Sequence, residues 1–358
     1  MKKSEKNNKK VLLLTPTFYP DKTGAAKYYD NYFQYLDGKI DLYVLTKKSS
    51  VLKKESKKIM REIPVFYNNI LRLTITPLFT LFKIVTLHLK FKFDFIHVHS
   101  SSILAFSAGV FSLIFRVPII YDVLDMQTPP ILLKIGRVHK YLATGNVVKE
   151  KLSTIRLPKE KILCFKPPRN SFKPCMVKKK NDVVFVGEVN KKIKGTDILL
   201  NAFNIIINEK RQNIKLLVVG DGPDMDESKK FIKQKKLDKN VSFLGSQPYK
   251  KTLDYISRSK ILVLPSRTEA TPRVIIEAFE LGTPVIGSDI KAISYMINDN
   301  QNGILFKDGN CLDLANKIVN LKKNEILQQK IRENALAKVK EYPTWKELSD
   351  KLMKVYTN

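Results

Sequence analysis

Two glutamates that lie eight positions apart, Glu269 and Glu277, occupy the stretch LPSRTEATPRVIIEAFELGTPVIGSD (264–289). Its apolar beginning predicts a buried strand that ends at Ser266, and Pro272 fits the first position of the next helix, where the missing N–H of proline costs nothing. Glu269 then lies on the loop before the helix and Glu277 inside it. One carboxylate can face the far end of a ligand while the other accepts hydrogen bonds from vicinal hydroxyls.

The start of the same helix offers free backbone amides. These amides run from Thr271 to Val274 and include that of Arg273, and helix N-termini of this kind bind anions. A sugar that bears a phosphate therefore fits the layout. The plain alternative is that Glu269 complements the helix dipole and that Glu277 is a solvated helical residue, and two glutamates alone do not decide between these interpretations.

Short β-branched runs alternate with helical stretches through almost the whole chain, which is typical of βαβ units and parallel sheets. The expected strands form two series. The first comprises 10–15, 40–46, 93–97, 118–122 and 140–144, and the second 182–187, 214–220, 241–245, 261–265 and 284–287. We therefore predict an α/β protein of two Rossmann-like, doubly wound parallel-sheet domains that face each other across a cleft, with ligands at the carboxyl ends of the strands.

The length of 358 residues and a hydrophobic fraction of 44% also indicate two domains, each with its own core. We place the first at residues 1–166 and the second at 183–342. The linker at 167–182 carries prolines and a basic run without periodicity. A last helix at 343–358 has apolar residues at helical spacing and is expected to pack back on the first domain.

The chain is strongly basic, with 64 Lys and Arg against 34 Asp and Glu and a net charge of +30. Nucleic acid, anionic lipid and a phosphorylated substrate are the candidate partners for such a charge. Lysine dominates and no nucleic-acid-binding module is evident, so we expect no nucleic-acid partner and favour an anionic membrane surface. The three cysteines, Cys164, Cys175 and Cys311, form no CxxC pair, which argues against a disulfide framework or a thiolate zinc site and fits a reducing cytoplasm.

Two strongly apolar segments, 70–92 and 103–115, bear on membrane contact. The run at 103–115 is too short to span a membrane, and the apolar run after the basic start of the chain is too short for a signal peptide. In 70–92 the apolar residues after Pro77 are too many for one narrow stripe, and three lysines border them. Two interpretations stay open, a core helix of the first domain and a helix that lies in the membrane surface.

Other polar clusters have simpler interpretations. The DxD at 224–226 follows a glycine turn, so acidic residues at a helix start explain it better than a metal-nucleotide site. His97 and His99 share one face of a strand end without a visible third ligand, which favours a structural or acceptor-side role over a metal. The GxG at 220–222 lacks the other features of a dinucleotide site. We expect no metal and no cofactor.

The pattern E-x7-E between a strand that ends in PS and a following G-T-P-V-I strand resembles the C-terminal domain of the family-4 (group 1) retaining glycosyltransferases, whose fold is GT-B. Other segments resemble the same family in the same order. In the second half they are VVFVGEVNKKIKGTDILLNAF (183–203), VVGDGPDMDE (218–227), VSFLGS (241–246) and NGILFKDGNCLDLANKI (302–318). In the first half the likeness is sparser, with TPTFYPDKTGAAKYYDNYFQYL (15–36), DFIHVHSS (94–101) and VPIIYDVLD (117–125).

The resemblance implies a role for each matched residue. Glu277 would hold the ribose hydroxyls, and Glu269 would lie against the donor sugar. Lys194 would neutralise the diphosphate, which the loop at Gly24 would approach from the other domain. Glu269, Lys194 and Asp125 are the implied catalytic residues, and no metal is required. The other implied donor-binding residues are Gly187, Gly222, Gly245, Ser246, Ser266, Thr271, Pro272, Arg273 and Val274.

Three positions depart from the family's pattern. Glu188 stands where the family usually has an arginine after the first glycine turn. The candidates to replace that arginine are Lys191, Lys192 and Arg273. Leu124, followed by Asp125, stands where most members have a histidine, and the sequence at 290–292 replaces an expected glycine-glycine loop. These departures bear on catalysis rather than on the fold.

The prediction is a retaining, metal-independent glycosyltransferase. It would move a sugar from a nucleotide-diphosphate-sugar, with a UDP-sugar favoured, to a glycan or polyprenyl-linked acceptor in bacterial cell-surface polysaccharide synthesis, such as capsule or O-antigen. We expect it to be a cytoplasmic protein, peripheral on the inner face of the cell membrane. The alternatives are a non-catalytic donor-binding or scaffold subunit, a GT-B-fold nucleotide-sugar epimerase and, as the weakest, a basic nucleic-acid-binding protein. The oligomeric state stays open.

Overall fold

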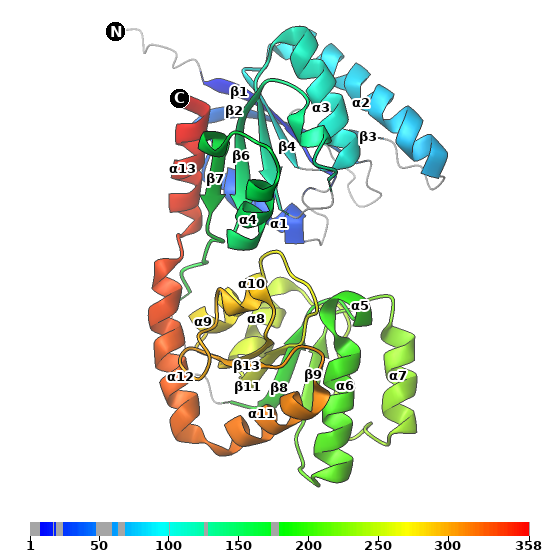
Figure 1. The fold of residues 1–358 in the computed structure, drawn as a ribbon, viewed down its shortest axis with the longest axis vertical. Helices are drawn as coiled ribbons and strands as arrows, with labels where there is room; N and C mark the ends of the chain where they lie inside the picture. Colours follow the sequence, from blue (N-terminus) through cyan, green and yellow to red (C-terminus); the bar gives the residue numbers. More distant parts are fainter. Residues whose placement is uncertain are drawn as a thin grey trace. The chain divides into compact units, whose positions relative to one another are not determined.

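The structure is a computed structural model that describes residues 8–16, 18, 24–47, 59–63, 69–99, 101–124, 128–172 and 179–357, with the side chains of 24–27, 59–62 and 69–74 left aside. The chain divides into two compact units (Figure 1). The first comprises Met1–Pro168 with Pro343–Asn358, and the second Arg169–Tyr342. Each unit is built around one parallel β-sheet with helices on both faces.

The sheet of the first unit contains seven described strands, all parallel, in the order β3-β2-β1-β4-β5-β6-β7. They are β1 (Lys9–Leu14), β2 (Ile40–Lys47), β3 (Ile59–Ile63), β4 (Phe95–His99), β5 (Ile119–Val123), β6 (Val138–Thr144) and β7 (Ile162–Phe165). The described helices of four or more residues are α1 (Gly24–Gln34), α2 (Asn69–Phe91), α3 (Ser102–Phe115), α4 (Asn146–Thr154) and α13 (Trp345–Thr357). From β1 the strand order runs through β2 to β3 on one side, and from β4 to β7 on the other. The topological switch point therefore lies between β1 and β4.

Alternating side chains of this sheet build two cores. Ile120 of β5 belongs to the core under α1 and α13, whereas the hydroxyl of the next residue, Tyr121, donates to the carbonyl of Ala105 in α3 on the opposite face. α13 begins with a capping box, in which the backbone N–H of Thr344 donates to Glu347 Oε2 and the N–H of Glu347 donates to Thr344 Oγ1. Its buried side chains, which pack in the same core as α1, include Trp345, Leu348, Leu352 and Tyr356.

The second unit contains six described strands, all parallel, in the order β10-β9-β8-β11-β12-β13. They are β8 (Asn181–Val186), β9 (Leu216–Val219), β10 (Val241–Phe243), β11 (Ser259–Leu264), β12 (Val285–Ser288) and β13 (Ile304–Phe306). The helices are α5 (Lys191–Lys194), α6 (Thr196–Asn204), α7 (Met225–Gln234), α8 (Tyr249–Ser257), α9 (Arg273–Glu280), α10 (Lys291–Ser294), α11 (Cys311–Lys323) and α12 (Glu325–Lys338). β8 and β11, which are far apart in sequence, lie side by side at the switch point.

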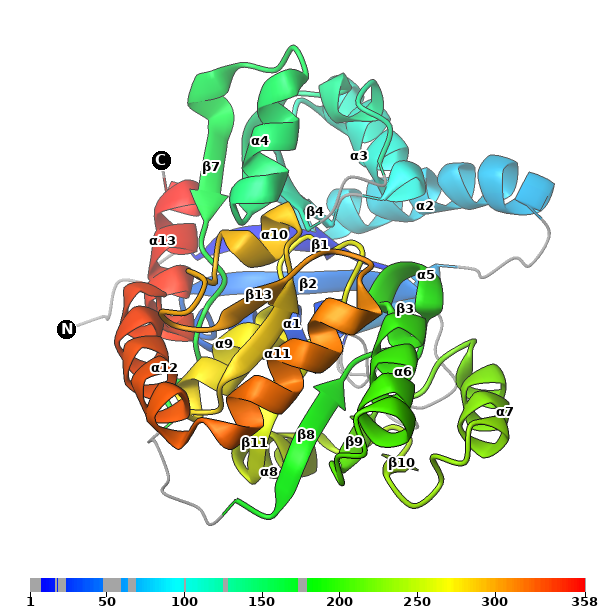
Figure 2. The same cartoon turned by 60° about the horizontal axis from the view of Figure 1, so that its bottom comes forward.

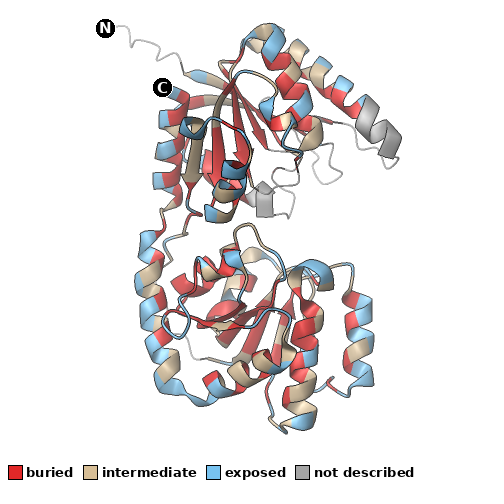
Figure 3. Cartoon of the chain, viewed as in Figure 1, coloured by how far each residue is buried: buried red, intermediate tan, exposed pale blue. Residues whose placement is uncertain are grey.

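Two hydrophobic cores cover the faces of this sheet. α6, α7 and α11 pack on one face, and α8, α9, α10 and α12 pack on the other (Figure 2). Adjacent residues of β8 show the alternation, because Val183 faces the first core and Val184 faces the second. Buried strands therefore run through the middle of the unit, and the exposed residues lie on the outer surfaces of the helices (Figure 3).

The predicted α/β class with two parallel-sheet units is confirmed. Three strands were not predicted, namely β3, β7 and β13, and each lies at the edge of its sheet. Edge strands are short and need no long apolar run, so their sequence signal is weak. β3, for example, reads IMREI and has two charged residues at its centre. None of the helices in the described part of the chain is long and apolar enough to cross a membrane.

Candidate active site

The predicted donor-binding residues of the second unit gather at one edge of its sheet. Parallel strands end at the same edge, and the loops after β8, β9, β10 and β11 carry Gly187, Gly222, Gly245 and Ser266 respectively. In open α/β sheets ligands bind at the carboxyl ends of the strands, beside the switch point. Here the switch point lies between β8 and β11, so the loops that follow these two strands define the candidate site.

Lys194 and Glu269 meet at this switch point. Lys194 Nζ lies 2.6 Å from Glu269 Oε1, and Ser266 Oγ donates to the same oxygen at 2.8 Å. The Glu269 side chain is only 9% exposed, whereas that of Lys194 is 24% exposed. The carboxylate is therefore held by two donors, and the ammonium keeps a solvent-facing side. Lys194 is the last residue of α5, and Gly195 after it is the N-cap residue of α6.

Backbone contacts fix the loops that carry this pair. The amide of Arg267 donates to the carbonyl of Ile193 at 2.9 Å, which ties the loop after β11 to α5. Gly195 follows Lys194 with a φ of 62°, and a Cβ placed there would lie 2.0 Å from the carbonyl oxygen of Pro265. Only glycine allows this approach. The distance between Lys194 and Glu269 is thus set by the backbone as well as by their charges.

Glu277 is buried, which contradicts the interpretation that it is a solvated helical residue. It lies in α9 with 9% of its surface exposed, and the hydroxyl of Tyr249 donates to its Oε1 at 2.9 Å. Burial, followed by the negative charge of Glu277, raises the pKa of Tyr249 well above its ordinary value. The phenol therefore stays protonated as a donor. The sequence carries no signal for Tyr249, because no motif links the first residue of α8 to a glutamate 28 positions later.

The N-terminus of α9 is close to its predicted position. The helix starts at Arg273, so Pro272 is the N-cap residue rather than the first helical residue. Thr271 and Val274 are both half-buried, and the side chain of Val274 packs against the core beneath the helix. At Val274 the backbone amide, and not the side chain, is therefore suited to contact a ligand. The positive charge of Arg273 acts on the phenol of Tyr249 and opposes the rise of its pKa.

The glycine turns shape the loops around this site. The amide of Gly220 donates to the carbonyl of Gly245 at 2.9 Å, which joins the loops after β9 and β10. A Cβ on Gly222 would lie 2.5 Å from the carbonyl oxygen of Val189, so Gly222 is needed for close backbone packing. Gly245 has a φ of 64° and open space around it, and the neighbouring Ser246 is exposed. Gly187 and Gly222 thus support the loops, whereas Gly245 and Ser246 present an accessible turn.

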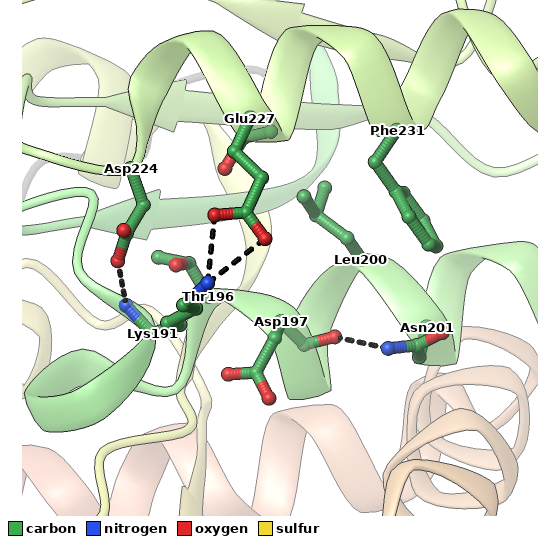
Figure 4. A pocket seen from close by; sticks show the side chains of 9 residues that line it. Lys191, Thr196, Asp197, Leu200, Asn201, Asp224, Glu227 and Phe231 are labelled. Carbon is green, nitrogen blue, oxygen red and sulfur yellow. Dashed lines mark hydrogen bonds and ion pairs between the residues drawn. The ribbon is translucent and has the colours of Figure 1, made fainter.

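The position where an arginine was expected holds an exposed glutamate. Glu188 Oε2 accepts a hydrogen bond from the side chain of Asn190 at 3.3 Å. Among the candidates to replace the arginine, Lys191 lies 2.7 Å from Glu227 Oε2, beside a small pocket between α6 and α7 (Figure 4). The charge of Lys191 is thus held by an acid that is not part of the candidate site. Lys192 is exposed, and Arg273 begins α9.

The other polar clusters have structural roles. Asp224 is the N-cap residue of α7, and its Oδ2 also accepts from the backbone N–H of Lys191 at 2.6 Å (Figure 4), in agreement with the interpretation of the DxD as a helix start. His97 Nδ1 lies 2.5 Å from the hydroxyl of Tyr356, and His99 Nδ1 lies 3.1 Å from that of Tyr29. No group of three or more His, Cys, Asp or Glu side chains in the described ranges is arranged to hold a metal ion.

The first unit contains two of the predicted site residues, Gly24 and Asp125. Gly24 is the first residue of α1, so it starts a helix instead of lying in a loop. Asp125 lies outside the described residues, and Leu124 before it packs against the core under α1 and α13. In the second unit, the segment that replaces the expected glycine-glycine loop begins α10, with Ile290 as its N-cap residue.

The part of the chain that carries this site resembles a known protein family. Residues 168–338 match the family model described as glycosyl transferases group 1, and this segment contains Lys194, Glu269 and Glu277. The second unit is therefore similar, over nearly its whole length, to the group 1 glycosyl transferases. The chain as a whole has the GT-B fold, as its match to solved glycosyltransferase structures over nearly its full length shows.

Two curated relatives each match less than half of this chain. N-acetyl-alpha-D-glucosaminyl L-malate synthase of Bacillus anthracis is 30% identical over 151 residues, which are 42% of this chain and 39% of that protein. Poly(ribitol-phosphate) alpha-N-acetylglucosaminyltransferase of Staphylococcus aureus is 32% identical over 162 residues, which are 43% of this chain and 32% of that protein. The chain thus spans less than half of the length of these relatives.

Solved structures resemble the whole chain. Sucrose-phosphate synthase from Thermosynechococcus elongatus has a TM-score of 0.80 and 17% identity, and the match covers 98% of both chains. HepE of Anabaena, solved in complex with UDP and glucose, has a TM-score of 0.77 and 17% identity, and the match covers 98% of this chain and 100% of that one. At this level of identity the likeness establishes the fold.

Proposed function

We propose that this protein is a retaining, metal-independent glycosyltransferase that transfers a sugar from a UDP-sugar to a glycan or polyprenyl-linked acceptor. The observation that carries the proposal is the pair of supported carboxylates at the edge of the second sheet. Lys194 and Ser266 hold Glu269, and Tyr249 holds Glu277. We further propose a role in bacterial cell-surface polysaccharide synthesis at the inner face of the membrane, since one relative is named for transfer to poly(ribitol-phosphate).

The proposed chemistry needs charge stabilisation at the leaving group. The bond between the sugar C1 and the diphosphate oxygen breaks, and C1 forms a bond with the acceptor oxygen on the same face of the sugar. The acceptor proton passes to the departing diphosphate, so no nucleophile of the protein is required. Lys194 and the amides at the start of α9 would stabilise the negative charge that grows on the diphosphate. Such preorganised charges would stabilise the leaving diphosphate in the way that a bound metal ion does in other enzymes.

Glu277 would bind the ribose hydroxyls, and Glu269 the donor sugar. A buried carboxylate that Tyr249 already orients can accept hydrogen bonds from vicinal hydroxyls without reorganisation. Support for a UDP-sugar comes from HepE, whose structure contains UDP and glucose. Support for retention comes from two relatives whose names specify alpha products. When the sugar is alpha-linked in the donor and also in the product, the reaction has retained the anomeric configuration.

Calorimetry with UDP, GDP, ADP and their sugar conjugates tests this proposal, with either EDTA or magnesium in the buffer. We expect one nucleotide to bind equally well under both conditions. Transfer from the matching donor to a membrane extract should then give a product whose anomeric configuration, read by NMR, equals that of the donor. Inversion of configuration, or binding that disappears in EDTA, would contradict the proposal.

A donor-binding subunit without activity is the second candidate, and one observation favours it. Glu188 places a negative charge at the turn where the family usually has an arginine, and the nearby Lys191 is engaged by Glu227. Such a protein would bind the nucleotide but would transfer no sugar even with the crude extract. Turnover of the donor in the absence of any acceptor would instead indicate an epimerase.

A further inference from the structure

α2 presents a stripe of large apolar side chains to solvent. Exposed fractions along this stripe are 42% for Ile75, 65% for Leu78, 61% for Phe82 and 57% for Leu89. Spacings of three, four and seven residues place these side chains on one face of the helix. The stripe therefore covers more than three turns of α2 and is not a set of scattered exposed residues.

The inner face of α2 has the opposite composition. Thr76 and Thr80 are buried, with exposed fractions of 4% and 0%, next to the fully buried Ile84. An ordinary amphipathic helix places its threonines outside and its large apolar residues inside. α2 reverses this arrangement over the first part of its described side chains. α2 therefore has a core face, in line with the first interpretation of residues 70–92, and a separate apolar face toward solvent, and the membrane-surface interpretation stays a prediction.

α3, beside α2, buries Leu104 and Phe111 in the core but also exposes other large apolar side chains. Phe106, Leu113 and Ile114 are 39%, 58% and 64% exposed, whereas Ser107 and Ser112 are fully buried. The small inner residues allow close packing, and Ser107 Oγ donates to the carbonyl of Pro77 in α2 at 2.9 Å. The two helices are therefore in direct contact. We call the exposed side chains of both helices the α2–α3 apolar face; its members are Ile75, Leu78, Phe82, Leu89, Phe106, Leu113 and Ile114.

We propose that the α2–α3 apolar face inserts into the surface of an anionic lipid bilayer and holds the protein on the membrane. The proposal rests on the proposed function, since it specifies the surface by which the protein would reach a polyprenyl-linked acceptor. Large apolar side chains on helices that lie parallel to a membrane insert into the boundary between headgroups and acyl chains.

The charges around this face fit an anionic bilayer. Neither helix contains an aspartate or glutamate, and the whole segment 95–121 is free of acidic residues. Lys90 and Lys92 are exposed at the end of α2, and Arg116 is exposed at the end of α3. Lys83 also lies on α2, with its Nζ 5.6 Å from the centre of the Phe79 ring. Basic residues that border an apolar face strengthen its attraction to anionic lipids.

A second copy of the chain fits this face less well. A symmetric dimer would bring the same surface of two molecules together. Lys90, Lys92 and Arg116 would then lie close to the same three cations of the partner, and neither helix contributes an acidic residue to such an interface. An anionic membrane neutralises these charges and accepts the apolar side chains at the same time. The bilayer is therefore the occupant that the composition of this face favours.

Flotation of the full-length protein with vesicles tests the proposal. The vesicles are phosphatidylcholine alone or phosphatidylcholine with 30% phosphatidylglycerol. The test variant combines Phe82→Ser with Leu113→Ser, and the matched control combines Leu312→Ser with Ile326→Ser, which remove apolar side chains that are 51% and 86% exposed on the second unit. We expect the test variant to bind anionic vesicles at least about tenfold more weakly than the wild type, and the control to bind normally. Thermal unfolding of all three proteins checks that they are folded.

A second variant separates charge from apolar insertion. Lys83→Gln with Lys90→Gln should weaken binding to the anionic vesicles and make it less sensitive to salt, while leaving weak binding to neutral vesicles unchanged. Equal binding by the wild type and the Phe82→Ser, Leu113→Ser variant would overturn the proposal. A dimeric wild type that this variant converts to a monomer, with no vesicle binding by either protein, would also overturn it and assign the face to a second copy.

Failure of the membrane proposal can be distinguished from failure of the proposed glycosyltransferase function. Nucleotide binding, measured by calorimetry without vesicles, should be the same in the wild type and in the Phe82→Ser, Leu113→Ser variant. Vesicle binding without any nucleotide binding would leave the membrane surface standing and remove the proposed function. Nucleotide binding without vesicle binding would do the reverse.

Discussion

The ion pair between Lys194 and Glu269 links two residues that are 75 positions apart. Glu269 holds the ammonium of Lys194 at 2.6 Å, and Ser266 gives the carboxylate a second donor. A bound diphosphate would compete with Glu269 for the same ammonium. Because Ser266 continues to hold Glu269, the carboxylate keeps a partner when Lys194 turns toward a phosphate. This arrangement suits a cation whose main contribution comes as the leaving group gains charge.

Replacing Lys194 with alanine should lower sugar transfer more than it lowers donor binding. Loss of one preorganised charge at a leaving group costs roughly 10²–10³-fold in kcat. The measurement compares kcat with the calorimetric Kd for the donor, and Lys230→Ala, which removes an exposed lysine of α7, serves as the control. If transfer and binding fall by the same factor, Lys194 contributes only to ground-state binding.

Replacing Glu277 with alanine should weaken nucleotide binding by about 1.5–3 kcal/mol, because the ribose hydroxyls lose a charged acceptor. Tyr249→Phe removes the donor that orients Glu277 at 2.9 Å and should have a smaller effect, about 0.5–1.5 kcal/mol. Both losses should vanish with a nucleotide that lacks the 2′ and 3′ hydroxyls. A persistent loss with that analogue would show that Glu277 acts on the fold and not on the ribose.

At the scale of single elements, α9 carries two buried carboxylates with different tasks. Glu277 turns toward Tyr249, and Glu280 accepts hydrogen bonds from the backbone amides of Asn170, Ser171 and Phe172. Those residues begin the second unit, and Arg169 Nε donates to the carbonyl of Tyr342 at its end. One helix therefore helps to form the candidate site and also anchors the segment by which the chain enters the unit.

Two glycines with nearly equal φ angles make a matched test of loop geometry. Gly195 has φ 62° and Gly245 has φ 64°, but a Cβ would lie 2.0 Å from a backbone oxygen at Gly195 and would meet no atom within 4 Å at Gly245. Gly245→Ala should therefore cost only the conformational term, about 1–2 kcal/mol of unfolding free energy. Gly195→Ala should cost more and should also weaken donor binding. Urea unfolding of both variants checks this order, and equal losses would contradict it.

Some elements were predictable and others were not, for physical reasons. Central strands and α9 carry long apolar patterns, so their positions follow from local sequence. β3, β7 and β13 lie at sheet edges, and their pairing depends on neighbours that come from elsewhere in the chain. The side chain at 249 carried no signal, because its role depends on α8 and α9 being adjacent on one face of the sheet.

At the scale of the whole molecule, stability should respond to alkaline pH through Lys179. Its ammonium donates to the carbonyl of Ser257 and to Thr283 Oγ1, and burial, with a smaller repulsion from Arg332, lowers the pKa of Lys179 to about 8 from 10.5. Between these two values the unfolded chain binds more protons than the folded chain. The free energy of unfolding should therefore rise with pH in this window, by at most about 1.4 kcal/mol per pH unit.

Urea unfolding at pH 7.5 and pH 9.5, with wild type and Lys179→Met, isolates this effect. The variant has no proton to lose at this position, so the stability of the wild type relative to the variant should increase as the pH rises. A difference that stays constant between the two pH values would show that the ammonium of Lys179 has its ordinary pKa in the folded chain.

Hydrophobic periodicity and helix signals are local, so the sequence alone predicts the two parallel-sheet units and the strand, loop and helix that carry Glu269 and Glu277. Which distant groups meet depends on the tertiary structure. It brought Lys194, and not Lys191, to Glu269, and it placed Tyr249 on Glu277. It also left several large apolar side chains of α2 and α3 exposed while Thr80 and Ser107 are buried. Such choices depend on contacts between segments that no local pattern records.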